Sequence, residues 1–501
     1  MKHLYIWLLV TAMLSSSCES WFKAPEEEQP VEQTVVPNDN TTPDDGTDTE
    51  TPNDGSTDIP DNSGLDNTDD NSNSGDATIS ATVLARNKWI NEDMTEYYFW
   101  NAQMPDIDYT KEADSEKYFE ALLYKDDQWS VISDNYRQFM LDFYGETVAA
   151  GFDPSFYAFY NSTKVFILVN YVYPQSDAAR KGLKRGDIIL RINGQDLTTT
   201  NYYQLFSSSS MTVELGTAKV SGNTTSIALS GKKLTFTDAI DSYDPSIYYT
   251  VVENGGHKIG YLVYVSFVTG GSKQYLQTLD NIFAIFKDAG ITDLVVDLRY
   301  NLGGDVNAAI HLASLIAPKN VAASKKVLVE LLYNTGLTEK IRTESPESLY
   351  VRFDGVSNNL DMSRVWFLTG AWTASSSELV MSGLMPYMDV RLVGQPTYGK
   401  FYGATVLPDD NKEWVICPIT MKYANVDGLT DFADGLQPDY PVSEQLITAQ
   451  FGDMADPEFA QAVNLISGVS TRGAADTVTP LSSFRKFQSP AQLQKNLLIS
   501  K

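Results

Sequence analysis

Blocks of apolar residues with different spacings divide the chain into regions. A short apolar run is followed by a long polar stretch, a region with helical periodicity, a region of strands, and a region where strands and helices alternate. Such alternation is typical of a layered α/β domain. We predict a multidomain α/β protein with a signal (1–17), a linker (18–82), a helical domain (83–141), a strand-rich domain (142–240), an α/β domain (241–468) and a peripheral C-terminal tail (469–501).

The two middle domains differ in the period of their apolar residues. Ile90, Met94 and Tyr97 recur at helical spacing, and a second helix is predicted from Ser115 to Leu123. The strand-rich domain contains predicted strands at 165–172 and 188–192, a short helix at 176–181, a tight hairpin turn at Asn193–Gly194, and polar loops at 207–210 and 221–225.

The α/β domain carries the longest series of alternating elements. We predict strands at 259–267, 294–298, 365–368 and 390–393, and helices at 275–288, at 306–316 and after Ser375. Cys417 lies in an apolar, strand-like run, where a packed small residue is expected rather than a nucleophile.

The N-terminal apolar run, Leu4 to Leu14, is too short to span a bilayer and follows the basic Lys2. Three serines then lead into Cys18, an arrangement that resembles a bacterial lipoprotein signal, in which the cysteine is lipidated. The alternative is a cleaved signal with an incidental cysteine. We expect secretion across the inner membrane and a lipid anchor in the cell envelope, on its periplasmic or cell-surface side.

Charge changes the interpretation of the linker more than that of the folded part. Of the 501 residues, those from Ala24 to Asp76 include 16 acidic and no basic residues, so more than half of the net charge of −28 comes from this segment. A polar, like-charged segment cannot bury enough apolar surface to fold, so an extended tether is expected. The acidic balance also argues against nucleic-acid binding, which requires Lys and Arg.

Histidine usage excludes several classes of hydrolase. Outside the signal, the chain has only His257 and His311, and it has no His-Glu-x-x-His, no Cys-x-x-Cys and no Gly-x-Ser-x-Gly. A catalytic zinc site and a serine–histidine hydrolase are therefore disfavoured, although His311 stays open as a base. We predict no metal and no cofactor.

Two other segments have the composition of a nucleophilic site. A predicted buried strand runs into Gly303–Gly304, where backbone N–H groups could approach a reacting carbonyl, and an ordinary strand-to-helix turn is the alternative. Ser375 precedes a predicted helix, and Lys400 follows 25 residues later. A lysine activates a serine only when it is neutral, and burial favours that form. A serine N-cap and a solvated lysine are the alternative.

These motifs together resemble the S41 family of tail-specific, or C-terminal-processing, serine peptidases. The resemblance is carried by Asp-Leu-Arg-Tyr-Asn-Leu-Gly-Gly (297–304), Ser-Ser-Ser-Glu (375–378), Gly-Gln-Pro-Thr-Tyr-Gly-Lys (394–400), Gly-Leu-Gln-Pro-Asp (435–439) and the PDZ-like Gly-Leu-Lys-Arg-Gly-Asp-Ile-Ile-Leu-Arg-Ile-Asn-Gly (182–194). It implies a ClpP/crotonase-like catalytic core, a PDZ domain and a small N-terminal helical domain.

The resemblance also implies roles for individual residues. Ser375 would be the nucleophile and Lys400 the base. Gly303, Gly304 and Ser376 would supply oxyanion-hole N–H groups. Glu378 occupies the position of a supporting acid in one branch of the family. Other branches have glutamine or aspartate where this chain has Ala404 and Pro386, so the third catalytic member stays open.

The partners implied are polypeptides with exposed C-termini, which a PDZ domain would capture, and the membrane through the anchor; the sequence carries no signal for an oligomeric state. A catalytically silent PDZ lipoprotein that only binds peptides is the first alternative to a peptidase. A glycan-binding surface lipoprotein, suggested only by the 28 tyrosines and the anchor, ranks last.

Overall fold

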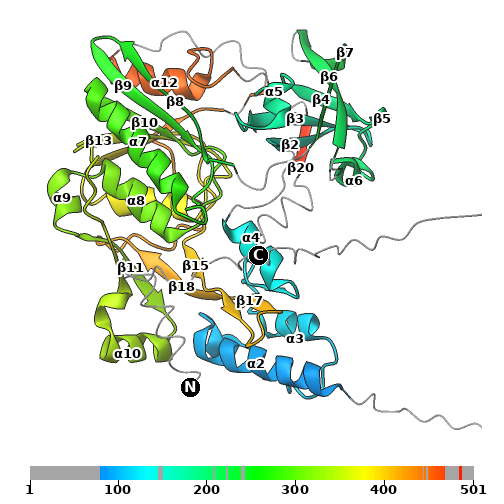
Figure 1. Ribbon diagram of the computed structural model, residues 1–501, viewed down its shortest axis with the longest axis vertical. Helices are drawn as coiled ribbons and strands as arrows, with labels where there is room; N and C mark the ends of the chain where they lie inside the picture. The colour runs from blue at the N-terminus through cyan, green and yellow to red at the C-terminus, as the bar shows by residue number, and fades with distance from the viewer. Residues whose placement is uncertain are drawn as a thin grey trace, which may run out of the picture.

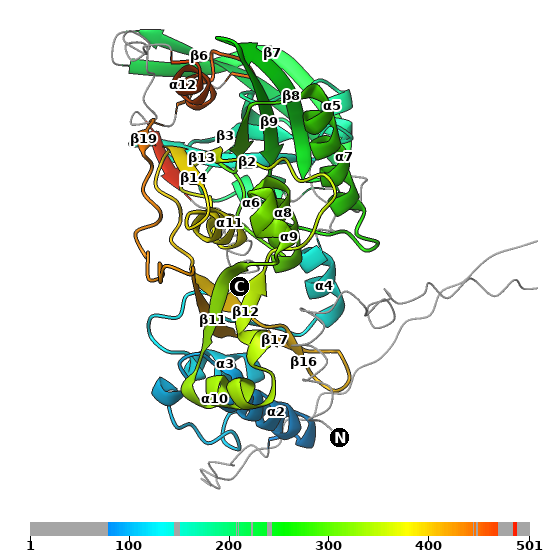
Figure 2. The same cartoon turned by 90° about the vertical axis from the view of Figure 1, so that its left-hand side faces the viewer.

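The computed structural model describes residues 79–144, 151–206, 208, 210–221, 224–237, 243–443, 445–446, 449–468 and 484–487. The predicted signal, Cys18 and most of the predicted linker and tail lie outside the described residues. Figure 1 shows the α/β domain and the strand-rich domain at one end of the molecule and the N-terminal helices at the other. Strands extending from the α/β domain connect the two ends, as the turned view in Figure 2 also shows.

A six-stranded sheet forms the centre of the α/β domain, in the order β19-β14-β13-β10-β9-β8. All neighbouring pairs are parallel except β8 and β9, which form a hairpin. Its strands are β8 (Ser246–Asn254), β9 (His257–Tyr264), β10 (Asp293–Asp297), β13 (Arg364–Thr369), β14 (Asp389–Gly394) and β19 (Tyr440–Pro441). Their interiors are rich in buried Val, Leu and Ile, as expected for a sheet covered on both faces.

Helices cover this sheet on both faces. Apolar residues of α7 (Gln274–Ala289), α8 (Val306–Ile316) and α11 (Ser376–Leu384) form one core with it, and α12 (Pro457–Ile466) packs in a second core. Local sequence explains several boundaries: Asp305 and Asp456 cap α8 and α12, and Gly290, at φ +63°, ends α7. The predicted strands and helices of this domain are confirmed within a few residues.

The strand-rich domain is a single sheet in the order β20-β2-β3-β4-β6-β7, with β5 beside β4. Its elements are β2 (Phe152–Phe159), β3 (Val165–Val172), α5 (Asp177–Arg180), β4 (Ile188–Ile192), β5 (Gln195–Asp196), α6 (Tyr202–Phe206), β6 (Ser210–Ser221), β7 (Thr224–Thr237) and β20 (Phe484–Phe487). The Asn193–Gly194 turn is confirmed, with φ +52° and +77°.

The predicted loop at 221–225 is wrong, because β6 continues to Ser221 and β7 starts at Thr224. The polar pattern misled the prediction because this end of the β6–β7 ribbon is largely exposed, so its strands do not need apolar residues. Backbone pairing continues at this end as far as Ser221 and Thr224. At the other end of the ribbon, the hydroxyls of the cross-strand pair Thr212 and Thr235 lie 2.9 Å apart.

The N-terminal helical domain includes α2 (Ala81–Tyr97), η1 (Asn101–Gln103), α3 (Ser115–Leu122), β1 (Val131–Ser133) and α4 (Tyr136–Tyr144). Its core is shared with elements far along the chain, because Ile90 and Tyr118 belong to the same cluster as Leu337 and Ile419. Those later elements are β11 (Val327–Tyr333), α10 (Thr335–Glu344), η2 (Pro346–Leu349), β12 (Tyr350–Arg352), β15 (Tyr402–Ala404), β16 (Leu407–Pro408), β17 (Val415–Cys417) and β18 (Ile419–Ala424). The short helix α9 (Lys319–Ala323) packs instead in the core of the α/β domain.

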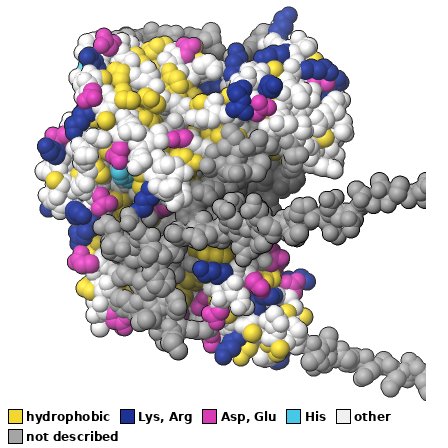
Figure 3. All heavy atoms as spheres, in the orientation of Figure 1, with side chains coloured by type: hydrophobic (Ala, Val, Ile, Leu, Met, Phe, Trp, Pro, Cys, Tyr) yellow, Lys and Arg dark blue, Asp and Glu magenta, His cyan; other side chains and the backbone are white. Residues whose placement is uncertain are grey.

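Surface charge is mixed on the face drawn in Figure 3, where basic and acidic side chains are interspersed over the described residues. Apolar side chains gather on the α/β domain in this view. Tyr249 on β8 and Ile285 on α7 are among the exposed apolar residues. No helix in the described segments combines the length and the apolar character that crossing a bilayer requires.

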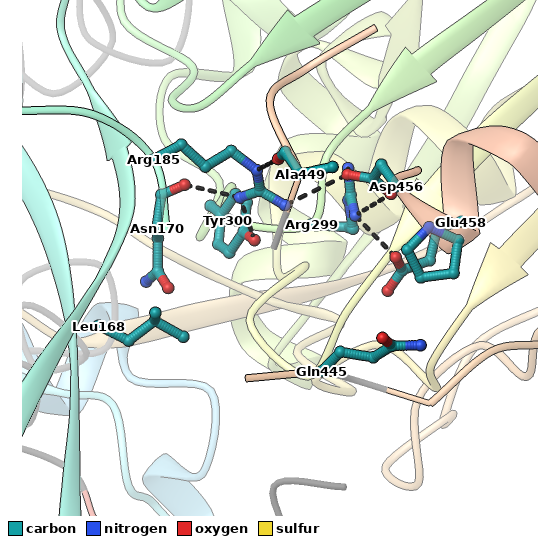
Figure 4. Close-up of a pocket in the computed structure, with 10 residues that line it drawn as sticks. Leu168, Asn170, Arg185, Arg299, Tyr300, Gln445, Ala449, Asp456 and Glu458 are labelled. Atoms are coloured by element: carbon teal, nitrogen blue, oxygen red, sulfur yellow. Dashed lines mark hydrogen bonds and ion pairs between the residues drawn. The ribbon is translucent and has the colours of Figure 1, made fainter. Parts of the chain in front are cut away.

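A buried ion cluster joins the strand-rich domain to the α/β domain (Figure 4). Arg185 donates to the carbonyl of Asn170 at 2.6 Å, to the Tyr300 hydroxyl at 2.6 Å and to the carbonyl of Ala449 at 2.8 Å. It also pairs with Asp456 at 3.3 Å. A small cavity at this junction is lined by Leu168, Asn170, Arg185, Arg299, Tyr300, Gln445, Ala449, Asp456, Pro457 and Glu458.

Candidate active site

Ser375 stands at the start of α11, just beyond the carboxyl end of β13. Its backbone has φ +55° and ψ −114°, a strained conformation for a residue with a side chain. The surrounding fold holds it there, because every residue of α11 is buried. Strain of this kind is concentrated at functional sites, and the N-terminus of a helix favours negative charge. The sequence-predicted nucleophile therefore has a backbone setting suited to that role.

The Gly303–Gly304 turn lies directly against this serine. A Cβ added at Gly303 would lie 2.7 Å from the Ser375 Cβ, and one at Gly304 would lie 2.1 Å from the Phe267 carbonyl oxygen. The two glycines have φ +101° and +134°. Only glycine fits both the conformation and the space, so the turn brings backbone close to Ser375 as the sequence predicted.

Asn301 fixes the turn against the Ser375 segment. Its side chain accepts from the Gly303 N–H at 2.9 Å and donates to the Tyr264 carbonyl at 2.9 Å. Its own carbonyl accepts from the Ala374 N–H and from the Ser377 hydroxyl, both at 3.0 Å. Asn301 is fully buried. The sequence contained this residue within a motif, but nothing in its local pattern indicated that four hydrogen bonds meet there.

The three predicted oxyanion donors are in different situations. The Gly303 N–H is already engaged by Asn301. No hydrogen bond from the Gly304 N–H occurs among the described residues, and the Gly304 carbonyl accepts from the Ser376 hydroxyl at 2.7 Å. Ser376 is the first residue of α11, so its N–H has no partner within the helix. Gly304 and Ser376 thus carry the available N–H groups beside Ser375.

Glu378 connects the serine to the lysine segment. Its Oε2 accepts from the Ser375 N–H at 2.8 Å and from the Lys400 N–H at 2.9 Å. Its Oε1 accepts from the Gly399 N–H at 2.7 Å and from the Thr397 hydroxyl. The carboxyl group is fully buried, and this burial raises its pKa. Glu378 touches backbone rather than the two reactive side-chain atoms, so its arrangement is that of a positioning residue.

Lys400 is 5% exposed, and its burial lowers the pKa of its ammonium to about 8. The carboxylates of Asp127 and Glu378 partly offset the lowering. The Cys417 thiol has its own pKa raised to about 12 by burial, so it stays neutral. A lysine with this pKa has an appreciable neutral fraction near neutral pH, whereas an ordinary lysine has almost none.

Two contributors to the lysine environment were not found from the sequence. Thr397 donates to Glu378 and accepts from the Leu436 N–H at 2.7 Å, which ties the Gly-Gln-Pro-Thr segment to the Gly-Leu-Gln-Pro-Asp segment. Asp127 comes from the N-terminal domain, more than 270 positions before Lys400. No local sequence pattern indicates that two residues this far apart in the chain lie close together in the fold.

The histidines are elsewhere in the fold. His257 Nδ1 lies 2.7 Å from Asp293 Oδ2, and His311 Nε2 lies 3.3 Å from Asp280 Oδ1. Neither pair includes a residue of the Ser375 site. Ala404 lies on β15, and Pro386 follows α11. The contacts of Glu378 link the serine and lysine segments, together with the Tyr398 N–H, which donates to the Thr373 carbonyl at 2.9 Å.

Comparison with known families agrees with this architecture. The family described as peptidase family S41 matches residues 258–442, the peptidase S41 N-terminal domain matches residues 85–131, and the PDZ domain matches residues 168–214. A solved structure assigned to the S41 proteases, from Bacteroides fragilis, has a TM-score of 0.62 and 26% identity, and the match covers 76% of this chain and 97% of that one.

Curated relatives have similarly low identity and are matched over only part of their length. A carboxyl-terminal-processing protease of Synechocystis is 24% identical over 303 residues, covering 58% of this chain and 63% of the relative. The carboxy-terminal processing protease CtpA of Bacillus subtilis is 23% identical over 269 residues, covering 52% of this chain and 50% of the relative. The chain thus spans about half to two thirds of the length of these relatives. The strand-rich domain is a PDZ domain, and the chain belongs to peptidase family S41.

Proposed function

We propose that this protein is a serine endopeptidase in which Ser375 is the nucleophile and Lys400 the general base. The observation that carries the proposal is the buried lysine, whose pKa of about 8 leaves roughly a tenth of it neutral at pH 7. Glu378 supports the proposal, because a single carboxylate oxygen accepts from the backbone of both residues. The proposed chemistry needs neither a metal nor a cofactor.

In the first half of the reaction, the neutral Lys400 amine takes the Ser375 proton. The serine oxygen attacks the peptide carbonyl carbon and forms a tetrahedral oxyanion, which the Gly304 and Ser376 N–H groups would stabilise. The Lys400 ammonium then protonates the leaving nitrogen as the C–N bond breaks. The N-terminal part of the substrate remains as an ester on Ser375.

In the second half, Lys400 takes a proton from water, and the resulting hydroxide attacks the ester carbonyl. When the tetrahedral intermediate collapses, the serine oxygen leaves and recovers the proton from Lys400. One peptide bond and one water are consumed, and a carboxylic acid and an amine are produced. The dyad returns to its starting protonation state, so each cycle needs only substrate and water.

The dyad is tested by measuring kcat/KM against pH on an unstructured substrate. We expect activity to rise through a single group near pH 8. Ser375→Ala and Lys400→Ala should each reduce kcat by at least about a thousandfold while the thermal unfolding remains cooperative. His311→Ala is the matched control and should keep the wild-type pH profile. Collapse of activity in folded His311→Ala would move the base to histidine.

We propose that the PDZ domain selects polypeptides by their C-terminal tails, since PDZ domains add an extended peptide to a sheet edge. A tailed substrate should then have a lower KM than the same substrate with an amidated C-terminus, at equal kcat. If the wild-type chain binds such tails but cleaves nothing, the protein is instead a catalytically silent peptide-binding member of the family.

We further propose that Cys18 is lipidated and anchors the protein in the cell envelope through an extended acidic tether. The layout of residues 1–76 supports this. Cys18→Ser should move the protein from the membrane fraction to the soluble fraction without a change in kcat. Retention of Cys18→Ser in the membrane would exclude the lipid anchor.

A further inference from the structure

Strand β20 comes from the C-terminal segment of the chain, yet it belongs to the PDZ sheet. It pairs antiparallel with β2, and Phe484 to Phe487 lie opposite Phe159 to Phe156. On its other side β2 pairs with β3, so without β20 it would be the edge strand of the sheet. Figure 1 shows β20 (red) beside β2, at the end of the chain's colour range.

Side chains seal β20 to this edge. Phe484 is 6% exposed, and its ring lies 5.0 Å from the ring of Phe166 and 5.5 Å from that of Phe159. The Lys486 ammonium lies 5.8 Å from the Tyr157 ring and 5.7 Å from the Trp372 ring. Trp372 is three residues before Ser375. The strand therefore contacts the PDZ sheet and the loop that leads to the proposed nucleophile.

The edge that β20 covers has the features of a peptide-binding edge. Helix α6 lies along one face of β2, with the Phe156 ring 5.1 Å from Tyr202 and the Phe152 ring 5.7 Å from Phe206. A peptide that adds to β2 gains main-chain hydrogen bonds from the strand and side-chain pockets from this face. β20 already uses the strand, so a second peptide cannot pair there at the same time.

The direction of β20 is also that of a bound tail. From Phe484 to Phe487 it runs toward the start of β2, which follows Gly151 at φ +75°. A carboxylate captured by backbone N–H groups at that turn would belong to a chain running the same way. β20 itself is internal, because 14 residues follow Phe487. β20 therefore resembles a PDZ-bound peptide in its direction and strand pairing, but it has no terminal carboxylate at the start of β2.

We propose that residues 484–487 are an intramolecular ligand of the PDZ domain, which a substrate tail must displace before it can bind. The recognised segment has the pattern aromatic-basic-basic-aromatic. This inference rests on the proposed tail selection by the PDZ domain but not on the Ser375–Lys400 chemistry. An occupied edge lowers the apparent affinity for tails by the fraction of molecules in which the edge is open.

Binding is measured directly, so that the result does not depend on catalysis. The full chain carrying Ser375→Ala is titrated into a fluorescent peptide with an apolar C-terminus and a free carboxylate, and into its amidated form. Phe484→Asp removes the aromatic anchor and should tighten binding of the free-carboxylate peptide about tenfold, as expected if β20 leaves only about a tenth of the edges open. Arg485→Ala, at an exposed position of the same strand, should stay within about twofold of the parent.

A reversible disulfide provides a second test that remains valid if Phe484→Asp misfolds. Ala158 and Arg485 are direct cross-strand partners, so Ala158→Cys/Arg485→Cys can form a disulfide that holds β20 in place. Cys18→Ser is included, and Cys417 is buried. The oxidised protein should bind the tail peptide at least about tenfold more weakly than the reduced protein, while thermal unfolding stays cooperative in both.

Three results would overturn the inference. Equal tail affinity of Phe484→Asp and its parent would show that β20 does not compete with tails. Equal affinity of the oxidised and reduced lock would show the same by an independent route. A disulfide that links two chains would show that β20 is exchanged between copies rather than bound within one. Loss of peptide cleavage in Ser375→Ala bears only on the proposed dyad.

Discussion

One buried carboxylate, that of Glu378, organises the geometry of the proposed Ser375–Lys400 site at the scale of single residues. Four donors converge on its two oxygens, from the serine segment and from the lysine segment. Charge-assisted hydrogen bonds of this kind are short and directional, so they fix the backbone from which each reactive side chain projects. The structure therefore indicates that Glu378 positions the two segments and does not transfer a proton.

The substitution Glu378→Gln tests that role. It replaces one carboxylate oxygen by an amide nitrogen that would face two donors, leaving buried donors unsatisfied at a cost of about 2–4 kcal/mol. We expect kcat to fall about 10- to 100-fold, KM to change little, and the pH midpoint set by Lys400 to stay near 8. The measurements are urea unfolding and kcat/KM against pH. Loss of the pH-dependent limb would instead make Glu378 a proton-transfer group.

Asp127 gives a second residue-scale prediction. Its negative charge favours the charged form of Lys400, so removing the charge should lower the Lys400 pKa further. The rising limb of kcat/KM should therefore move to lower pH in Asp127→Asn, with kcat at high pH within a few-fold of wild type. Asp126→Asn, at an exposed neighbouring position, is the control and should not move the limb. A shift of the rising limb of kcat/KM to higher pH in Asp127→Asn would contradict the assignment of that limb to Lys400.

At the scale of elements, the ion cluster between the PDZ domain and the α/β core combines two guanidiniums with three carboxylates. Arg299 donates to Asp297, Asp456 and Glu458 at 2.6–3.2 Å, and Arg185 reaches Asp456 from the PDZ side. Burial and the neighbouring Asp456 raise the pKa of Glu458 to about 7. In the folded protein the Glu458 carboxyl thus keeps a proton that it loses near pH 4.5 in the unfolded chain.

This raised pKa makes stability depend on pH in a defined direction. Protonated Glu458 contributes to the free energy of unfolding. This contribution is fully present below about pH 4.5 and is lost as pH rises through about 7. Glu458→Gln stays neutral, so we expect its unfolding free energy to gain about 2 kcal/mol relative to wild type between pH 5 and 8. Guanidinium unfolding at several pH values measures the difference. A difference independent of pH would mean that Glu458 is ionised throughout.

The sequence predicted these elements better than the contacts between them. Strand β3 and helix α8 agree with their apolar patterns, and the positive φ of Asn193 and Gly194 follows from their residue types. The β6–β7 ribbon was missed because exposed strands lack an apolar alternation. The cluster around Arg299 was also missed, since Arg185 and Asp456 are separated by 271 positions and no local signal pairs them.

At the scale of the whole molecule, the N-terminal helices are attached to the α/β core by buried polar contacts as well as by a shared apolar core. Asn334 Nδ2 donates to the carbonyls of Glu96 and Tyr98 at 3.0 and 3.1 Å, and its Oδ1 accepts from the Leu337 N–H at 2.8 Å. The Phe99 N–H donates to the Ile419 carbonyl at 2.8 Å. These contacts set where Asp127 stands relative to Lys400.

Asn334→Ala should loosen this attachment. Three buried backbone groups would lose their partner, which we expect to cost about 2–4 kcal/mol. Limited proteolysis between residues 98 and 135 should become faster, and kcat should fall. Lys340→Ala, which removes the half-exposed ion pair with Glu96, is the control and should cost less than about 1 kcal/mol. Equal effects of the two changes would contradict the importance of the buried contacts.

The pairing of β1 with β17 has a consequence for the order in which the molecule becomes active. Residues 131–133 leave the ribosome long before residues 415–417, their antiparallel partners. The N-terminal helices therefore cannot complete their core until residues 415–417 have been synthesised. Lys400 acquires its dry surroundings only in that last assembly step. Before that step Lys400 would be solvated and almost fully charged at neutral pH, so we expect the proposed peptidase activity to appear only after residues 415–417 have joined the fold.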